Sequence, residues 1–450
     1  MSKRRVMSII LAVCIGVLAA GCGKGAGTET VVESKSEVDV TEGKTKAPEI
    51  TEAEKEPVTL KLMAMSTGDG NPEYDALIQA FEEKYPWITI EAEYLGIGDT
   101  YSNSLVTRLK GNNAPDLFHV ASGTGSAYSG LLLAEGGYIM DLSGEPWAKE
   151  LVPDAYRSAW WLDDTLTAVP LQLAPIIVEY NTARFEELGL KVPTTMDEFF
   201  EAGRKSVEQG QSFLVLSGAH TGHSVHLLTS IAMGLVYSEN PNWDQDRYEG
   251  KVSFAETEGW VKTLDYFMQM CDEGFFIPGS EGMDTNSGHV ALANGEGLAR
   301  VVPAGNIHIV EAINDELHLS AFVMPGETAD KTSVAGMIAD GVAGYAKTKH
   351  PEEVMLFIDF LVSDGGLNTY TSITGNIAMS DLVTGTVLNE KLACVQPLIQ
   401  EKRIYSHPQT EWPGQAYQAL GEGVQSMMLG IVTPEELLKN LDEAWEEGMK

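Results

Sequence analysis

Apolar positions in the first half of the chain change their spacing in a regular order. Short apolar or alternating runs, typical of strands, alternate with segments of helical spacing, in the order 58–65, 72–85, 87–94, 101–110 and 116–120. Repeated strand–helix units of this kind predict an open, mostly parallel sheet. Ligands of such sheets bind beyond the carboxyl ends of the strands, so we expect Asp69 and Ser122, which follow the first and third strands, to lie at a binding edge.

An extended segment, residues 170–181, interrupts this pattern in the middle of the chain. It contains Pro175, which has no amide hydrogen and cannot continue a central ladder. The segment therefore predicts a strand that passes between two lobes and bends there. Gln172 lies at this predicted hinge. Helices are expected after it, and Thr195 and Thr433, each followed three residues later by Glu, predict capping boxes at two of their starts.

Several motifs, in this order, resemble the family 1 extracellular solute-binding proteins, the receptors of ABC importers for sugars. They are Phe81-Glu-Glu-Lys-Tyr-Pro86, Pro115-Asp116, Ala168-Val-Pro170, Glu179-Tyr-Asn-Thr-Ala-Arg-Phe185 and Pro193-Thr-Thr-Met-Asp-Glu-Phe199. The resemblance covers the chain from Val58 to Lys450. It implies an α/β, two-lobed periplasmic-binding-protein-like fold, each lobe a mostly parallel sheet flanked by helices, with the ligand cleft between the lobes. The expected first lobe is 58–172 plus about 318–378, and the second is about 173–317 plus 379–450.

The resemblance also implies a function. A monomer would capture a carbohydrate, expected to be an oligosaccharide, between two closing lobes and deliver it to the membrane permease subunits of an ABC importer. No cofactor and no metal are expected. The same fold could hold a non-sugar solute, such as a polyamine or a metal chelate. An exported glycan-processing hydrolase is a more distant alternative, since the sequence offers no carboxylate pair at a recognisable spacing and no nucleophile or phosphate-loop motif.

Sugar sites combine aromatic faces that stack on the ring with polar side chains that bond its hydroxyl groups. The cleft positions that the resemblance implies give the following ligand-binding candidates: Asp69, Ser122, Trp160, Trp161, Gln172, His223, His226, Asn306, Met337, Asn376 and Trp412. A core role is equally open for Trp160 and Trp161. Trp412 is expected to be an exposed loop aromatic, whereas Trp445 belongs to the apolar stripe of a helix. Asn306 and Asn376 lie where the chain departs from the family pattern, which leaves the identity of the ligand open.

A histidine cluster, formed by His220, His223 and His226, is the most suggestive group for chemistry. Residues at i and i+3 of a helix could share a metal ion, but the residue at i+6 points away and no Cys or carboxylate lies beside the group. We therefore expect no metal there, and consider hydrogen bonding to a polar ligand or a structural role.

The N-terminus predicts export. Lys3, Arg4 and Arg5 precede an apolar run over residues 6–18, and the small residues Ala20 and Gly21 precede Cys22. This arrangement resembles the lipobox of bacterial lipoproteins, in which residues 1–21 are removed and Cys22 is acylated. Two or three acyl chains anchor a protein stably, which places the protein on the outer face of the cytoplasmic membrane. The alternative is an ordinary cleavable signal with an incidental cysteine.

Composition adds two limits. Residues 22–57 contain no Phe, Trp or Tyr and are rich in polar residues, which predicts a disordered tether. The formal net charge of −35 disfavours nucleic acid and anionic lipid as partners, so membrane contact is expected through the lipid anchor only, while a cationic ligand stays open. After removal of the signal and acylation of Cys22, Cys271 and Cys394 remain, as one disulfide or as two isolated thiols.

Overall fold

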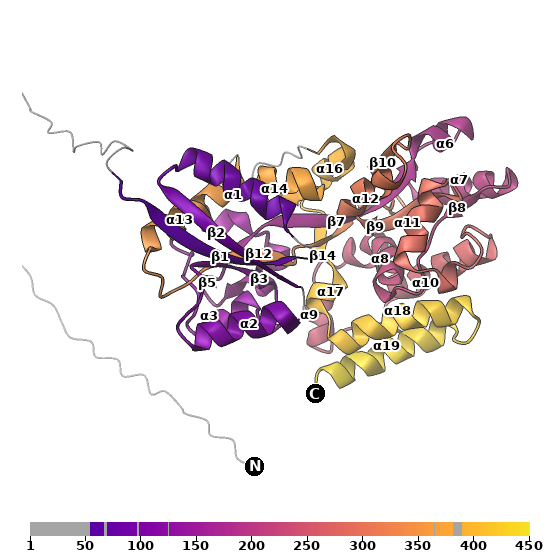
Figure 1. Ribbon diagram of the computed structural model, residues 1–450. Coiled ribbons are helices and arrows are strands. Elements are labelled where there is room, and N and C mark those ends of the chain that lie inside the picture. Colours follow the sequence, from indigo (N-terminus) through magenta and orange to yellow (C-terminus); the bar gives the residue numbers. More distant parts are fainter. Residues whose placement is uncertain (1–54, 67–69, 97–98, 125, 364, 381–388) are drawn as a thin grey trace, which may run out of the picture. The chain divides into compact units, whose positions relative to one another are not determined.

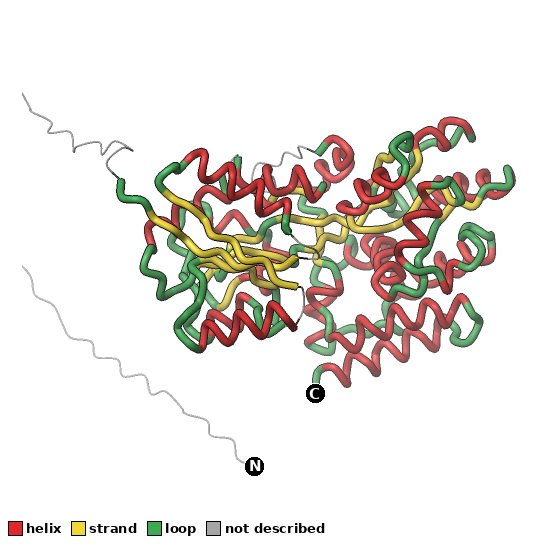
Figure 2. Tube along the Cα trace, in the orientation of Figure 1, coloured by secondary structure: helices red, strands yellow, loops and turns green. Residues whose placement is uncertain are grey.

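Two β-sheets organise the part of the chain that the computed structural model describes, which is residues 55–66, 70–96, 99–124, 126–363, 365–380 and 389–450 (Figure 1). Cys22, the predicted signal, most of the tether and Asp69 lie outside these residues. Helices flank both sheets, as Figure 2 shows in red beside the yellow strands. The predicted α/β architecture with two sheets is confirmed by this arrangement.

The first sheet has the strand order β2-β1-β3-β12-β6. Its strands are β1 (Val58–Ser66), β2 (Ile88–Gly96), β3 (Leu117–Ala121), β6 (Val169–Pro170) and β12 (Asp340–Gly344). Strand β1 runs parallel to β2 and to β3, and β12 returns antiparallel to β3. The predicted parallel strands therefore place their carboxyl ends at one edge, with the start of β12 beside them.

Helices α1 (Pro72–Lys84), α13 (Pro351–Leu361) and α14 (Gly366–Thr374) lie on one side of this sheet, and α2 (Asp99–Lys110) and α3 (Gly130–Glu135) lie on the other (Figure 1). Helix α1 starts where its sequence predicts. The Asn71 side chain accepts a hydrogen bond from the Tyr74 amide, and Pro72 occupies the first turn. The apolar face of α1 is buried at Tyr74, Leu77, Ile78 and Phe81.

The second sheet has the order β14-β11-β7-β9-β8, and β10 and β13 also pair with β7. Its strands are β7 (Gln172–Asn181), β8 (Ser212–Leu214), β9 (Gly297–Pro303), β10 (Leu319–Phe322), β11 (Val334–Met337), β13 (Ile377–Ala378) and β14 (Ile404–Ser406). Only the β8–β9 and β11–β14 pairs are parallel. This sheet is mixed rather than mostly parallel, because β7 runs against β9, β10, β11 and β13.

Strand β7 crosses from one set of partners to another at Pro175. Gln172 and Leu173 pair with β13, and Ala174 and Pro175 pair with β11. From Ile176 onward the partners are β9 and then β10. The strand is continuous through the proline, so the missing amide hydrogen falls where the ladder partners change.

The side chains of β7 enter two hydrophobic cores because alternate residues of a strand point to opposite faces. Leu173 and Ile177 belong to the core that fills the first sheet and continues onto one face of the second, whereas Ile176 and Val178 belong to the core on the opposite face. The first core includes apolar side chains of α11 (Thr285–Ala293), α12 (Ile307–Ile313), the 3₁₀ helix η7 (Glu390–Val395) and α16 (Gln396–Gln400). The second includes those of α7 (Met196–Glu208), α8 (Thr221–Ala232), α10 (Glu258–Asp272), α18 (Gly414–Met428) and α19 (Pro434–Gly448).

The chain returns to the first sheet later than the sequence predicts. Residues 319–322, expected in the first lobe, form β10 and pair with Val178–Asn181 at the far end of β7. The return is made by β12, which joins β3 and β6. A strand of alternating burial fits the edge of either sheet, so the apolar pattern alone does not identify its partner.

Shorter elements complete the described chain: α4 (Ala148–Leu151), η2 (Asp154–Tyr156), α5 (Arg157–Trp160), the hairpin β4 (Trp161–Leu162) and β5 (Thr165–Leu166), α6 (Thr182–Glu187), a π-helical turn (Met233–Tyr237), α9 (Trp243–Tyr248), η4 (Ser280–Gly282), η5 (Ala304–Asn306), η6 (Ala329–Lys331) and α17 (Pro408–Glu411). The capping box at Thr433 is complete, whereas Glu198 accepts hydrogen bonds from Thr194 instead of the Thr195 amide. Cys271 and Cys394 are free thiols. In the described residues, every helix falls short of the length and apolar character that a bilayer span requires.

A buried ion pair ties β7 to β9. Glu179 and Arg300 are opposite each other in the ladder, and the Arg300 Nε and Nη2 atoms donate to Glu179 Oε1 at 2.8 and 2.6 Å. Both side chains are at most 1% exposed. Burial raises the pKa of Glu179, and the adjacent guanidinium opposes this shift.

Removing one partner of this pair should destabilise the protein strongly. We expect Glu179→Gln to lower the free energy of unfolding by about 3–5 kcal/mol, because the guanidinium stays buried without a counter-charge. Urea denaturation measures the difference. The exposed pair of Arg204 and Glu273 is the matched control, for which Glu273→Gln should cost about 1 kcal/mol or less. Equal losses in the two variants would contradict the assignment of Glu179 as a buried structural anion.

Candidate functional site

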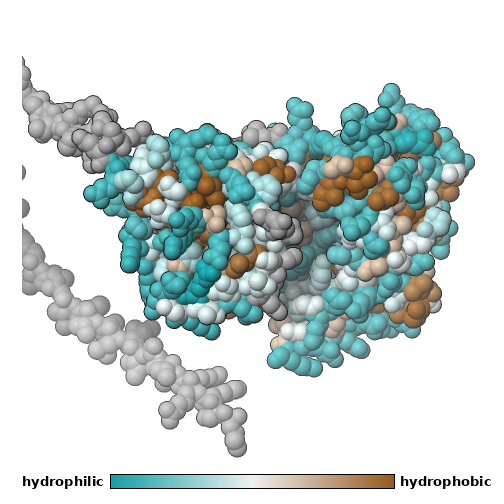
Figure 3. Space-filling view, in the orientation of Figure 1, coloured by the Kyte–Doolittle hydropathy of each residue, from teal (hydrophilic) through white to brown (hydrophobic). Residues whose placement is uncertain are grey.

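A pocket lies at the carboxyl ends of β1 and β3, where the first sheet meets the start of β7. Its volume is about 300 Å³, and the polar residues that line it are Ser66, Asn71, Glu73, His119, Gln172, Asp340 and Thr374, together with Tyr74 and Tyr370. In the view of Figure 3 the surface is hollowed between the side that carries the first sheet and the side that carries the second. We call this site the strand-end pocket.

His119 connects the polar groups of the strand-end pocket. Its Nε2 lies 3.1 Å from Asp340 Oδ1, and its Nδ1 lies 3.2 Å from the Tyr74 hydroxyl. An ionised carboxylate only accepts, so Nε2 carries the proton and Nδ1 accepts from Tyr74. Burial raises the pKa of Tyr74 well above its usual range, which keeps this hydroxyl a donor. The Asp340 side chain, which is 37% exposed, is thereby held in place and keeps acceptor capacity for a ligand.

Gln172 forms the hinge side of the same pocket. It is the first residue of β7, and its Oε1 accepts a 2.6 Å hydrogen bond from the Thr374 hydroxyl at the end of α14. This bond uses the carbonyl oxygen of Gln172 and leaves its amide group as a donor. Since Asp340 accepts and Gln172 donates, the pocket can bond both the hydrogen and the oxygen of a hydroxyl group.

The second sheet has a comparable edge at the carboxyl ends of the parallel pair β8 and β9. Asn306 follows β9, and its Oδ1 lies 3.2 Å from His289 Nε2. His220 is exposed beside the start of α8, and its ring centroid is 4.7 Å from that of His223. This edge carries imidazole and amide groups, whereas the edge of the first sheet carries a carboxylate.

The predicted histidine candidates are buried. The His226 Nδ1 atom lies 3.0 Å from His407 Nε2, and His407 Nδ1 accepts from the Gln409 amide at the start of α17. Burial lowers the pKa of His223 and of His407 to about 3, and it lowers the pKa of His226 well below its usual range. All three are therefore neutral near pH 7. Among the described residues, no group of three His, Cys, Asp or Glu side chains is arranged to hold a metal ion.

Trp412 differs from the expectation of an exposed platform. It is only 6% exposed, its Nε1 donates to Asp244 Oδ1 at 2.9 Å, and its ring packs against those of Trp260 and Trp445. The polar sequence around it suggested a loop. However, Pro408 starts the short helix α17, which turns the following tryptophan into the core.

The other aromatic candidates are also buried. Trp160 is fully buried against the backbone of Gly341, and Trp161 is 8% exposed with the Arg157 guanidinium 3.9 Å from its ring. Both rings therefore occupy the core role that the sequence left open. Tyr417, which was not a candidate, is half-buried on α18, and its hydroxyl lies beside Gly222 at the start of α8. This tyrosine is the better aromatic candidate on the second edge.

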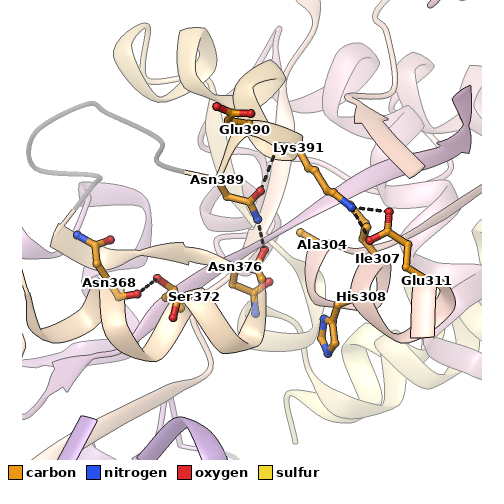
Figure 4. A pocket seen from close by; sticks show the side chains of 12 residues that line it. Ala304, Ile307, His308, Glu311, Asn368, Ser372, Asn376, Asn389, Glu390 and Lys391 are labelled. Carbon is orange, nitrogen blue, oxygen red and sulfur yellow. Dashed lines mark hydrogen bonds and ion pairs between the residues drawn. The ribbon is translucent and has the colours of Figure 1, made fainter. Parts of the chain in front are cut away.

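Three further candidates lie near β7 or the strand-end pocket. The Ser122 amide donates to the Ala339 carbonyl next to Asp340. Met337 is half-buried and pairs with Ala174 of β7. Asn376 lies in a neighbouring pocket between α12 and α14 (Figure 4). The predicted candidates that the described structure brings to one place are therefore Gln172 and, on the adjoining backbone, Ser122.

Sequence analysis missed His119 and Asp340, which are the centre of the strand-end pocket. A signal for His119 was present, because a histidine inside the short apolar strand 116–120 needs a polar partner. Asp340 comes three residues after Met337, a predicted cleft position, but nothing in the local sequence shows that β12 starts beside the end of β3.

Replacing Trp412 tests its burial directly. We expect Trp412→Ala to lower the free energy of unfolding by about 3–5 kcal/mol, as for other large aromatic side chains removed from a core. Chemical denaturation measures this loss. Leu429→Ala is the control, since Leu429 is 55% exposed and its truncation should cost about 0.5 kcal/mol or less. Unchanged stability of Trp412→Ala would contradict the burial of this ring and would favour an exposed ring that stacks on the ligand.

Comparison with known proteins gives a consistent result. Residues 66–367 match the model of a family described as bacterial extracellular solute-binding protein. The multiple sugar-binding protein of Streptococcus mutans is 23% identical over 356 residues, which cover 76% of this chain and 79% of the relative. The apo form of RafE from Streptococcus pneumoniae is similar in structure, with a TM-score of 0.70 at 19% identity over 88% of this chain and 99% of that chain. A sugar transporter from Bacillus licheniformis, solved in complex with stachyose, has a TM-score of 0.61 at 19% identity over 87% of this chain and 100% of that chain.

Proposed function

The chain belongs to the family of bacterial extracellular solute-binding proteins, and from this we propose that it captures a carbohydrate, expected to be an oligosaccharide, and delivers it to an ABC importer. The observation that carries the proposal is the strand-end pocket, where Asp340, held by His119, faces the hinge residue Gln172. Neutral sugars need acceptors and donors side by side, and this pocket offers both. The sugars named for the similar proteins agree with this chemistry.

The mechanism would be conformational. The strand-end pocket belongs to the first sheet, the histidine and asparagine edge belongs to the second, and β7 connects them. A ligand that bonds to both edges stabilises the closed arrangement by its differential affinity, and the closed form is then presented to the permease. In this proposal the protein acts as a monomer and changes no covalent bond of its ligand. The proposal keeps the lobe ranges expected from the sequence, except that residues 319–322, which pair with β7, are assigned to the second lobe.

The acidic residues of the strand-end pocket favour one alternative ligand class. Glu73 and Asp340 line it, and no lysine or arginine occurs among its described lining residues. The ammonium groups of a polyamine could pair with these carboxylates. Spermidine is therefore tested for binding beside the sugars.

Asp340→Asn should weaken carbohydrate binding without unfolding the protein. A charge-assisted hydrogen bond contributes about 1.5–3 kcal/mol, so we expect an affinity loss of about tenfold to a hundredfold. Titration calorimetry with stachyose and with xylan and chitin oligosaccharides measures it, and assays for new reducing ends test for hydrolysis. Asp272→Asn, on the exposed surface of α10, is the control. Tight binding of spermidine with no response to any sugar, or catalytic release of sugar fragments, would overturn the proposal.

We further propose that the protein is anchored to the outer face of the cytoplasmic membrane through an acylated Cys22. The support is the basic, apolar and small-residue order before this cysteine. Cys22→Ser should move the protein from the membrane fraction to the soluble fraction, because the acyl chains provide the anchor. Fractionation and immunoblotting measure this, with calorimetry as a control that ligand binding is unchanged. Retention of the serine variant in membranes would refute the anchor.

A further inference from the structure

A separate pocket, with a volume of about 400 Å³, is lined by carboxylates and tyrosine rings that the proposed binding mechanism does not use. The carboxylates are those of Asp154, Asp244 and Glu411, and the tyrosines are Tyr237, Tyr248 and Tyr405. No lysine, arginine or histidine occurs among its described lining residues. We call this site the carboxylate pocket, because its negative charges have no cation beside them.

The walls of the carboxylate pocket belong to different hydrophobic cores. Ser158 lies in α5, between Tyr156 and Trp160, which are part of the core of the first sheet. Glu411 ends α17 and precedes Trp412, which is part of the second core. The Ser158 hydroxyl donates to Glu411 Oε2 at 3.4 Å. This bond therefore joins a segment of one core to a segment of the other.

Asp244 is held by two donors from the second core. Its Oδ1 accepts from the Tyr237 hydroxyl at 2.8 Å and from Trp412 Nε1 at 2.9 Å. Both donors reach the same oxygen, so Oδ2 can carry a proton without the loss of either bond. Glu411 is fixed nearby, since its Oε1 accepts from the Ser406 hydroxyl at 3.1 Å. The geometry therefore suits Asp244 in both its ionised and its protonated form.

The titratable groups around Asp244 come from each element that lines the pocket. Tyr237 of the π-helical turn, Tyr248 of α9 and Tyr405 of β14 stay protonated near pH 7, because burial raises the pKa of each. Asp154 of η2 is exposed, whereas Glu411 of α17 is half-buried. Among the described lining residues, the groups that add charge around Asp244 are therefore both carboxylates.

The basic side chains of the same elements bond elsewhere. Arg157 lies over the Trp161 ring, Arg247 pairs with Asp442 and Glu446, Lys251 pairs with Asp246 and Glu249, Arg403 pairs with Glu401, and His407 bonds to His226. Burial raises the pKa of Asp244 to about 7, the bonds from Tyr237 and Trp412 oppose this shift, and the charge of Glu411 adds to it. Burial also raises the pKa of Glu411. A proton is thus the available means of reducing the repulsion.

We propose that Asp244 and Glu411 form a proton-sensitive switch between the two cores. When Asp244 is protonated, the repulsion in the carboxylate pocket is reduced and the bond from Ser158 to Glu411 holds the walls together. When Asp244 is ionised, its repulsion with Glu411 and Asp154 weakens this contact, and the segments that carry Ser158 and Glu411 loosen. The switch goes beyond the proposed function, since it adds a response to the pH of the surroundings and needs no ligand.

Stability as a function of pH is the first test. An unfolded Asp loses its proton near pH 4 and Asp244 loses it near pH 7, so stability falls as the pH rises through this window and is constant above it. Asp244→Asn keeps an acceptor for Tyr237 and Trp412 but does not titrate. From pH 5 to pH 8, the unfolding equilibrium constant of the wild type, relative to that of Asp244→Asn, should rise about tenfold or more. Asp272→Asn, at an exposed position of α10, is the control and should keep the pH dependence of the wild type.

Two further measurements follow the switch in the folded protein. The emission of Trp412, taken as the difference between the wild type and Trp412→Phe, should titrate near pH 7, because its Nε1 donates to Asp244. Glu411→Gln should move this midpoint to lower pH, since it removes the neighbouring charge. Hydrogen exchange, corrected for its intrinsic pH dependence, should show protection of residues 154–160 and 404–412 falling about threefold or more from pH 5 to pH 8. Asp244→Asn should abolish this fall.

Three results would overturn the switch. The first is a parallel pH dependence of stability in the wild type and in Asp244→Asn. The second is an emission of Trp412 that does not change between pH 5 and pH 8, which can be tested in the wild type and in Glu411→Gln even if Asp244→Asn fails to fold. The third is an emission change without any loss of protection in residues 154–160, which would confine the titration to the second core. None of these results depends on whether a sugar binds.

Discussion

Strand β7 is the constraint on which the rest of the structure depends. A single strand of ten residues, Gln172–Asn181, has to pair with both halves of the second sheet and also begin at the edge of the first. The strand changes its pairing partners at Pro175, which is the only residue of β7 without an amide hydrogen for ladder hydrogen bonds. Its alternate side chains enter two different cores, so neither core can form fully without this strand. The buried pair of Glu179 and Arg300 then fixes its register against β9.

The binding edges follow from the same arrangement. Parallel strands place their carboxyl ends together, and β12 adds the side chain of Asp340 because its first residue pairs with the last residue of β3. His119, inside β3, then has a carboxylate on one ring nitrogen and a tyrosine hydroxyl on the other. On the second edge, burial lowers the pKa of His223, and the Asn306 side chain is an amide that does not ionise. A ligand that touches both edges therefore meets the carboxylate of Asp340 on one and these neutral groups on the other.

Local patterns predicted much of the fold but little of the site. The helices and strands around the first sheet and the crossing strand could be predicted, because helix and strand spacing depend on neighbours in sequence. Trp412 was misjudged because its polar surroundings describe a loop, whereas its burial depends on α10 and α19, which are far away in the chain. Asp340 and His119 were missed for the same reason, since they are 221 residues apart and meet only through the pairing of β12 with β3.

The position of the binding edges on two different sheets has a consequence for timing. The strand-end pocket lies at the edge of the first sheet, whereas Asn306 and His220 lie at the edge of the second. In the proposed closed form, a ligand held between these edges leaves only after they separate, so its contacts with the second edge act on the rate of departure more than on the rate of arrival. The time available for transfer to the membrane partner would then be set by the contacts that the ligand makes with the second edge.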